Sequence, residues 1–214
     1  MGNLSTPKSV QKLQTALHAK AKTEAGYRFY ALYDKIYRED ILAHAYVQCR
    51  SNKGAPGVDR QDFADVEKYG LERWLGELAL ALRQETYRPD PIRRVYIPKA
   101  NGKLRPLGIS TLRDRVCMTA AMLVLDPIFE ADLPPEQYAY RRGRNAQQAV
   151  TEVEETLFYD HPEVVDADLA DYFGSIPHTE LMVSLARRIV DSRVLHLIKM
   201  WLECAVEETD DNQP

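Results

Sequence analysis

The sequence predicts an α+β fold that is mostly helical. Apolar residues recur at helical spacing through most of the 214 residues. One Asn-Gly pair stands between two short runs that are typical of strands, and a third run, residues 164–169, alternates apolar and acidic side chains. With 45% hydrophobic and 28% charged residues, the composition is that of a globular protein and excludes a disordered or collagen-like chain.

Helical segments are expected wherever apolar residues repeat every three or four positions. The first follows Pro7, which has no N–H to leave unpaired at a helix start, and Asn145 is a typical N-terminal cap for a later one. Residues 116–125 are apolar almost all round, which predicts a buried central helix that Pro127 would kink near its end. The expected helices span residues 7–22, 28–49, 71–84, 112–129, 145–159, 178–190 and 192–205.

A β-hairpin is expected over residues 93–109, with its turn at the Asn-Gly pair. Lys99, Lys103 and Arg105 would cluster near its tip or on its exposed faces. Residues 54–59 precede it and contain two glycines, so this stretch is a loop in which close backbone approaches are possible.

Charge is segregated along the chain, although the net charge is only −4. Residues 88–115 contain eight Lys or Arg and two acids, and the turn at residues 141–144 adds three arginines. Residues 151–180 contain nine acids and no Lys or Arg. A cationic block beside an anionic block suits a protein that holds phosphates near a metal-binding carboxylate. Solvated surface charge is the alternative.

No membrane segment or secretion signal is indicated. The longest uncharged apolar run is about half of the ~20 residues that a membrane span needs, and residues 1–20 lack the apolar region of a signal peptide. A cytoplasmic location is therefore the default. The three cysteines lack the spacing of a zinc site, so we expect reduced thiols in the core.

The expected strand at residues 164–169 carries Asp166 and Asp168 on one face. Carboxylates are disfavoured in strands, and a bound divalent cation, which prefers oxygen ligands, would account for them. The following turn, residues 170–173, offers backbone N–H groups that could hold an anion such as a triphosphate. Two acids on an exposed edge strand are the alternative.

Six segments, in order along the chain, resemble those of bacterial group II intron reverse transcriptases with maturase activity. They are residues 27–40, 52–59, 97–109, 113–115, 136–144 and 165–178. The resemblance covers nearly the whole chain and implies the fingers and the first half of the palm of an RNA-directed DNA polymerase. It implies three parts: an N-terminal helical extension with the start of the fingers at residues 1–60, the fingers at 61–160, and a partial palm at 161–214.

The resemblance also implies roles for residues of the acidic segment. Asp168 would be the first catalytic aspartate and would bind Mg²⁺ together with the carbonyl of Leu169. Phe173 would be the aromatic gate whose ring excludes a ribose 2′-OH and so selects deoxynucleotides. The backbone at Asp171 and Tyr172 would contact the triphosphate.

The basic residues would bind phosphates. By resemblance, Lys99 and Arg105 would clamp the deoxynucleoside triphosphate, with Lys103 as a third cation. The expected contacts with the backbone of the RNA template or intron RNA are Arg113, Arg115, Arg141, Arg142 and Arg144. Plainer interpretations stay open: a solvated hairpin tip, Phe173 as a core residue, and residues 113–115 as an ion pair at a helix start.

Two residues depart from the family's pattern. Gly174 follows the gate aromatic where the family often has an aspartate, and Arg142 stands where proline is common before glycine. The second palm motif, an aromatic-x-Asp-Asp hairpin, is not found. Asp210 and Asp211 are the one Asp-Asp pair, but they lie in the polar stretch 207–214, which we expect to fray.

We therefore expect a truncated reverse transcriptase that does not polymerise alone, because one aspartate cannot hold the two metal ions of such enzymes. An RNA-binding module is the alternative from another class, and a truncated or decayed non-catalytic copy is a third. A half palm would expose strand edges and apolar surface, through which copies could self-associate.

Overall fold

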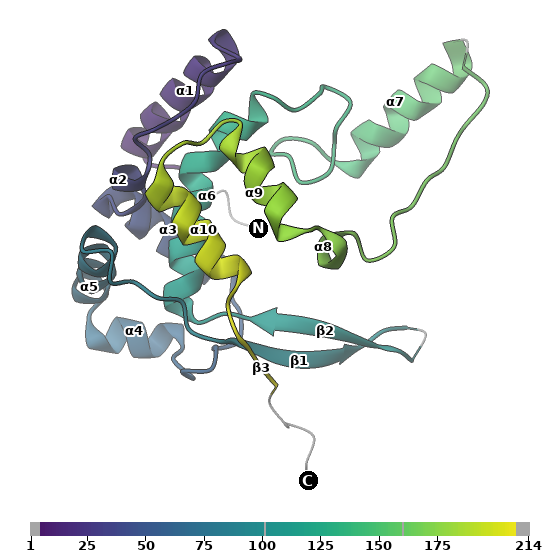
Figure 1. Ribbon diagram of the computed structural model, residues 1–214. Coiled ribbons are helices and arrows are strands. Elements are labelled where there is room, and N and C mark those ends of the chain that lie inside the picture. The colour runs from purple at the N-terminus through teal and green to yellow at the C-terminus, as the bar shows by residue number, and fades with distance from the viewer. Residues whose placement is uncertain (1–4, 101, 160, 209–214) are drawn as a thin grey trace.

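A long helix, α6 (Leu112–Glu130), runs through the middle of the structure, and other helices pack around it (Figure 1). The computed structural model describes residues 5–100, 102–159 and 161–208. Side chains of α6 between Val116 and Val124 are buried on several sides of the helix. The apolar stretch thus forms the central buried helix that the sequence predicts.

The described residues form ten helices and three strands, and only one small sheet. This combination confirms the α+β class. Beside α6, the elements are α1 (Lys8–Thr23), α2 (Tyr33–Ile36), α3 (Glu39–Asn52), α4 (Phe63–Tyr69), α5 (Leu71–Arg83), β1 (Ile92–Pro98), β2 (Leu104–Ile109), α7 (Ala146–Tyr159), α8 (Tyr172–Ser175), α9 (His178–Ala186), α10 (Ser192–Leu202) and β3 (Val206–Glu208).

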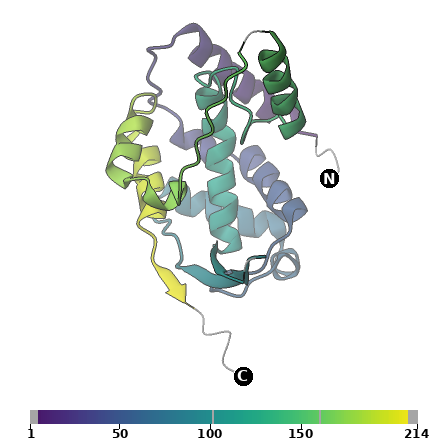
Figure 2. The same ribbon diagram turned by 90° about the vertical axis from the view of Figure 1, so that its right-hand side faces the viewer.

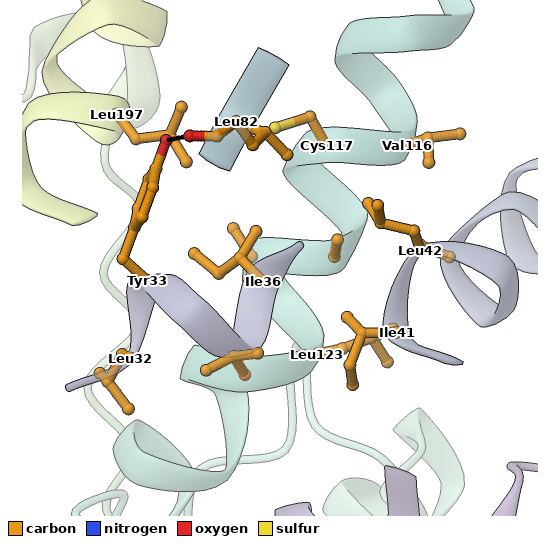
Figure 3. Packing of buried hydrophobic residues seen from close by; sticks show 14 of the residues in the cluster. Leu32, Tyr33, Ile36, Ile41, Leu42, Leu82, Val116, Cys117, Leu123 and Leu197 are labelled. Carbon is orange, nitrogen blue, oxygen red and sulfur yellow. Dashed lines mark hydrogen bonds between the residues drawn. The ribbon is translucent and has the colours of Figure 1, made fainter. Parts of the chain in front are cut away.

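The hydrophobic core lies between α6 and the helices around it. Figure 3 shows side chains from α2, α3, α5, α6 and α10 converging, among them those of Ile36, Leu42 and Leu197. Burying a large aliphatic side chain contributes roughly 1.5–3 kcal/mol, so this cluster holds the helices together. The hydroxyl of Tyr33 donates a hydrogen bond to the carbonyl of Leu82 at 2.9 Å, and burial raises the pKa of Tyr33 to about 12.

Pro127 lies inside α6 without ending it. Proline has no N–H, so the carbonyl of Leu123, four residues earlier, loses its helical partner. The side-chain amide of Gln14, in α1, donates a hydrogen bond to that carbonyl at 2.9 Å. The expected outer helix α1 therefore supplies the polar group that lets α6 continue to Glu130.

The single helix expected over residues 28–49 is wrong: two helices, α2 and α3, follow an extended segment. Phe29 in that segment forms an isolated parallel bridge with Ile189. The carboxylate of Asp191 accepts hydrogen bonds from the backbone N–H groups of Leu32 at 2.8 Å and Tyr33 at 2.9 Å. These N–H groups begin α2 and need an acceptor, and the residue that provides it is 159 positions from Leu32.

Arg188, which lies between α9 and α10 like Asp191, caps the C-terminal end of α1. Its guanidinium donates hydrogen bonds to the carbonyls of Ala21 at 2.9 Å and Tyr27 at 3.2 Å, and it pairs with Asp132 at 2.9 Å. Only 7% of its side chain is exposed. Because α1 leaves its last carbonyls unpaired, this arginine binds the N-terminal helix to the segment between α9 and α10.

Four other helices differ from expectation, and one of them, α8, begins within the stretch that the sequence predicts as a turn. α4 was not expected, and its start is fixed by a capping box in which Asp62 and Asp65 accept each other's backbone N–H groups at 2.9 and 3.0 Å. α9 and α10 end at Ala186 and Leu202, earlier than expected. The residues after α9 instead bind the segment around Phe29, as described above.

The sheet has the order β2-β1-β3. β1 and β2 form the expected antiparallel hairpin, with Ile97 opposite Arg105. β3 runs parallel to β1, so the stretch expected to fray begins as a strand; Glu208 pairs with Arg94 at 3.4 Å and accepts a hydrogen bond from the hydroxyl of Tyr96 at 3.2 Å. Residues 210 and 211 lie outside the described part of the chain.

Along the described ranges, no helix combines the length and apolar character needed to cross a membrane. Cys49 and Cys117 are buried free thiols. Cys204 is half-buried, and its thiol donates a hydrogen bond to the carbonyl of Asp90 at 3.0 Å.

Candidate nucleotide and nucleic-acid site

The hairpin carries its cations on one face. Side chains alternate along a strand, and directly opposed residues of antiparallel strands share a face. Arg105 lies opposite Ile97, and Lys99 follows Ile97 by two positions, so both cations project to the same side. The N–H of Lys99 donates to the carbonyl of Lys103 at 2.7 Å, which places these two residues opposite each other at the outer end. The clustering predicted for the hairpin is confirmed.

The strand expected at residues 164–169 does not form. Residues 161–169 belong to no helix or strand, and Asp166 and Asp168 are exposed. A strand needs backbone hydrogen bonds to a neighbour, and the three described strands pair only with one another. The sequence pattern of a strand is thus present here without a partner strand among the described residues.

Asp168 offers one exposed carboxylate. Nowhere in the described ranges do three or more His, Cys, Asp or Glu side chains come together to hold a metal ion. Mg²⁺ requires a near-octahedral shell of oxygen ligands. The carboxylate of Asp168 and the carbonyl of Leu169 have suitable chemistry, but they do not complete such a set, so the predicted Mg²⁺ site is incomplete in this structure.

Phe173, the predicted gate, stands at the surface in α8 and is 69% exposed. Its ring meets that of Tyr140 edge to face, with centroids 5.9 Å apart and an interplanar angle of 86°. The ring of Tyr172 also contacts Phe173, with the two centroids 5.4 Å apart. The alternative that Phe173 is a core residue is wrong, and the ring is instead oriented by two other exposed aromatic rings.

Asp171 lies beside the glycine that follows the gate. The backbone of Asp171 is left-handed, with φ 48°, and its carboxylate lies against Gly174. A Cβ added at Gly174 would lie 2.6 Å from Oδ2 of Asp171. An aspartate at 174, as is frequent in the family that the sequence resembles, would be repelled by this carboxylate, and the exposed side chain of Asp171 would have to turn away. Asp171 therefore supplies a carboxylate beside the position where that aspartate would stand.

Arg115 holds the glycine-containing loop that precedes α4. Its Nη2 donates a hydrogen bond to the carbonyl of Ala55 at 2.7 Å, and burial lowers the pKa of this guanidinium. Gly57 of the same loop lies against the start of α6, where an added Cβ would be 2.7 Å from the Cα of Thr111. The close backbone approach predicted for this loop is confirmed, and Arg115 has a structural role beside any contact with RNA.

Asp114 does not form the ion pair with its neighbours that the sequence leaves open. It is buried and accepts hydrogen bonds from the hydroxyls of Tyr87 at 2.6 Å and Thr111 at 2.8 Å and from the N–H of Asp90 at 3.1 Å. Burial raises the pKa of this carboxyl, and the hydrogen bonds oppose the rise. Arg113 lies over the ring of Tyr87, 5.7 Å from its centroid.

Arg141 is built into the protein. Its guanidinium pairs with Glu130 at 2.6 Å and donates to the carbonyls of Pro134 at 2.7 Å and Gln137 at 3.0 Å, and only 10% of its side chain is exposed. These contacts leave the group little capacity to bind phosphate. We therefore correct the interpretation of Arg141 from an RNA contact to a residue that fixes the turn after α6.

The two neighbouring arginines differ from Arg141. The side chain of Arg142 is 57% exposed and lies 3.8 Å from the carboxylate of Asp126. Arg144 lies over the ring of Tyr138, 5.0 Å from its centroid. Both remain predicted RNA contacts, held on a turn that Arg141 stabilises.

The hairpin and the acidic segment lie on the same side of α6. In Figure 2, which views the molecule from that side, residues 161–171 descend across the front of α6 from α7 to α8, and the hairpin lies below. Figure 1 shows α8 above the hairpin. The fold thus brings the cations of the hairpin and the predicted catalytic segment, far apart in sequence, to one side of the molecule.

A known family matches this part of the chain. The family described as "Reverse transcriptase (RNA-dependent DNA polymerase)" matches residues 97–213, which is more than half of the chain and includes the outer part of the hairpin with β2, α6 and the acidic segment. This chain belongs to the reverse transcriptase family.

Curated relatives place this reverse transcriptase chain among the group II intron type. Group II intron-encoded protein LtrA of Lactococcus lactis is 30% identical over 181 residues, which are 84% of this chain and 30% of LtrA. Protein YkfC of Escherichia coli (strain K12) is 38% identical over 200 residues, 88% of this chain and 51% of YkfC. The Putative COX1/OXI3 intron 1 protein of Saccharomyces cerevisiae is 27% identical over 161 residues, 74% of this chain and 19% of that protein. The resemblance seen in the sequence is confirmed, and the chain spans about half or less of the length of these relatives.

The sequence did not indicate the partners of the site residues in this reverse transcriptase chain. Tyr140 orients Phe173, and Glu130 binds Arg141, yet neither pair follows a local spacing rule. Two signals pointed to this turn: its three arginines, and the segment 136–144, one of the six that resemble the family.

Proposed function

We propose that the chain is the fingers and the first part of the palm of an RNA-directed DNA polymerase of the group II intron type. Residues 1–60 would be the N-terminal extension and the start of the fingers, residues 61–160 the rest of the fingers, and residues 161–214 a partial palm. Family membership supports the reaction class. The activity and partners of a whole polymerase are part of the proposal, because the chain spans 51% of YkfC and 30% of LtrA.

The shared face of Lys99 and Arg105 is the observation that carries the proposal. Two cations on one hairpin face can bind neighbouring oxygens of one triphosphate, and Lys103 lies opposite Lys99. We assign to these three residues the binding of an incoming deoxynucleoside triphosphate. The backbone of Asp171 and Tyr172 would contact the same triphosphate.

Two side chains of the acidic segment would face the reacting end of that nucleotide. Phe173 would exclude a ribose 2′-OH, which requires an exposed ring held in one orientation, and its contact with Tyr140 supports this role. Asp168, with the carbonyl of Leu169, would contribute part of a Mg²⁺ site. We do not assign a catalytic step to this chain alone, because its described donors do not complete that site.

Primer extension tests the reaction. The assay contains the 214-residue chain, an RNA template with a DNA primer, deoxynucleoside triphosphates and Mg²⁺. We expect no extension, since removing members of a catalytic unit removes nearly all of its contribution. Robust extension that disappears in Asp168→Ala would show that the chain is active alone and contradict this part of the proposal.

Triphosphate binding tests the role of the hairpin. Titration with a fluorescent deoxynucleotide should give weaker binding for Lys99→Ala and Arg105→Ala than for the unchanged chain. Lys68→Ala, which removes an exposed lysine from α4, is the matched control and should bind as the unchanged chain does. Equal binding by all four proteins would refute the assignment.

An RNA-binding module is the second candidate function, and the exposure of Arg142 favours it. Contacts with phosphates release counterions, so the affinity for RNA should fall as salt rises. The slope should be smaller in Arg142→Ala and Arg144→Ala and unchanged in Asp168→Ala. RNA affinity that does not change between low and physiological salt would exclude this function and leave the non-catalytic copy as the better description.

Self-association is the last part of the proposal. Val150 and Val165 are 66% and 94% exposed, and apolar surface of this kind usually marks an interface.

A further inference from the structure

Helix α7 carries an apolar stripe that nothing in the described chain covers. None of its residues is buried. Val150, Val153 and Leu157 recur at helical spacing and are 66%, 54% and 40% exposed. Val153 and Leu157, together with Val164 and Val165, line a hollow of about 420 Å³ between α7 and the segment that follows it. We call these five side chains the α7 surface.

The rim of the α7 surface is acidic. Glu154 is exposed and lies four residues after Val150 and three before Leu157, so it borders the stripe. Glu163 lines the hollow. Because residues 151–180 contain nine acids and no Lys or Arg, an occupant must combine apolar side chains with positive charge. Two α7 surfaces packed on each other would bring like charges together and are disfavoured.

The hairpin of the same chain has the complementary chemistry. Ile97 and Leu107 are 45% and 39% exposed. By the register of β1 and β2, Leu107 lies opposite Val95, so it shares a face with Ile97, Lys99 and Arg105. Lys103, opposite Lys99, lies on this face as well, so the face presents apolar side chains beside three cations.

The positions of the two surfaces allow a reciprocal contact. Figure 1 shows α7 and the hairpin projecting toward the same side of the molecule, α7 at one end and the hairpin at the other. Figure 2 shows both on the face turned to the viewer. A two-fold axis between them places the hairpin of each copy on the α7 of the other. Such an interface is closed and contains every contact twice.

We propose that two copies of this chain form a two-fold dimer in which the hairpin of each copy packs on the α7 surface of the other. The proposal specifies the self-association proposed above. In this dimer Ile97 and Leu107 cover the apolar stripe of α7, and Lys99 and Arg105 meet the acids of its rim. The dimer therefore covers the hairpin face whose cations a single copy offers to a triphosphate.

Charge reversal in matched pairs tests the dimer. One variant carries Lys99→Glu and Arg105→Glu, so that its hairpin and its α7 surface are both acidic. The other carries Glu154→Lys and Glu163→Lys, so that both of its surfaces are basic. In sedimentation velocity at low salt, we expect the unchanged chain to dimerise, each variant alone to be monomeric, and an equimolar mixture of the variants to dimerise again. All four substituted residues are exposed, and circular dichroism checks that the variants fold.

The apolar contact has its own control. Val153→Asp should give a monomer, whereas Leu80→Asp, at a residue of α5 that is 51% exposed, should leave the dimer intact. A mixture of the charge variants that stays monomeric, or a variant that dimerises alone, overturns the proposed contact. An unchanged chain that is monomeric at high concentration overturns the dimer itself. Because sedimentation needs neither RNA nor nucleotide, these results are independent of the assays for polymerase and RNA-binding function.

Discussion

Tyr140 holds the ring of Phe173 edge to face, with 5.9 Å between the ring centroids, although the two rings are 88% and 69% exposed. An aromatic pair of this geometry is worth about 0.5–1.5 kcal/mol. It links the turn after α6 to α8, which is only four residues long. The orientation of the predicted gate therefore depends on a residue outside its own segment.

Tyr140→Ala should loosen α8. We expect faster hydrogen exchange at the N–H of Ser175, which donates to the carbonyl of Asp171 at 2.9 Å, by about 2- to 12-fold if the pair contributes about 0.5–1.5 kcal/mol to local stability. Exchange is measured by NMR. Tyr140→Phe keeps the ring and should exchange like the unchanged chain; equal exchange in all three proteins would show that the contact does not order α8.

Arg141→Ala and Arg142→Ala should differ in their effects. Arg141 is largely buried and binds Glu130, so its loss should lower the free energy of unfolding by about 1–3 kcal/mol, measured by urea denaturation. Arg142 is exposed, and its loss should leave stability within about 0.5 kcal/mol while weakening RNA binding. If Arg142→Ala destabilised the chain as much as Arg141→Ala, the distinction between the two residues would be wrong.

Asp191→Ala should destabilise the fold through α2. Its carboxylate accepts the N–H groups of Leu32 and Tyr33, both of which are buried, and an unsatisfied buried donor costs about 1–3 kcal/mol. The midpoint of urea denaturation reports the loss. The control is Asp34→Ala, which removes an exposed acid of the same helix. Asp34 pairs with Lys35 at 3.1 Å, and a surface pair of this kind is worth at most about 1 kcal/mol. A loss from Asp34→Ala as large as that from Asp191→Ala would contradict the capping role.

His44 should make the chain less stable at mildly acidic pH. Burial lowers the pKa of this imidazole below its ordinary value of 6.5, and the charge of Arg142 lowers it further. The unfolded chain then binds a proton more readily than the folded one. Stability is therefore lost as the pH falls from about 6.5, the pKa in the unfolded chain, toward the lower pKa in the folded chain. Above the pKa of the unfolded chain, this group does not change the stability.

The comparison that isolates this effect is His44→Gln. Urea denaturation between about pH 7.5 and pH 5.5 should show a smaller loss of stability in this variant than in the unchanged chain. His178→Gln, at an exposed position, should keep the original dependence. If His44→Gln and the unchanged chain lost the same stability on going to acidic pH, a group other than His44 would be responsible for the loss.

Local signals in the sequence predicted the elements that depend on local interactions. The apolar stretch from Val116 to Leu125 predicted α6, and the Asn-Gly pair predicted the hairpin. Asn145 was expected to cap α7, and its side chain does accept the N–H of Gln148 at 3.0 Å. Most of the groups that satisfy the backbone of these elements lie within a few residues of it, so the sequence pattern is sufficient; the carbonyl of Leu123 in α6, which binds Gln14 of α1, is the exception.

The remaining features depend on distant partners. The start of α2 needs Asp191, which no helical periodicity reveals. Residues 164–169 have the alternation of a strand, but a strand also needs a neighbour, and alternation does not supply one. Arg141 reads as a surface cation in a basic turn, whereas its partner Glu130 lies at the end of α6. Residue types and their order along the chain therefore predicted which residues belong to the candidate site. The contacts between distant segments, which the sequence does not reveal, corrected the role of Arg141 and the expected strand at residues 164–169.

The cap that Arg188 places on α1 has a consequence for biosynthesis. Ribosomes make α1 early, but the guanidinium that binds the carbonyl of Ala21 is added 167 residues later. Until Arg188 is synthesised, the end of α1 and the extended segment around Phe29 thus lack their native partners, and contacts this far apart in sequence form slowly. A nascent chain interrupted before residue 188 would leave these groups open to chaperones and proteases. The N-terminal region is therefore completed only when the segment between α9 and α10 has been synthesised.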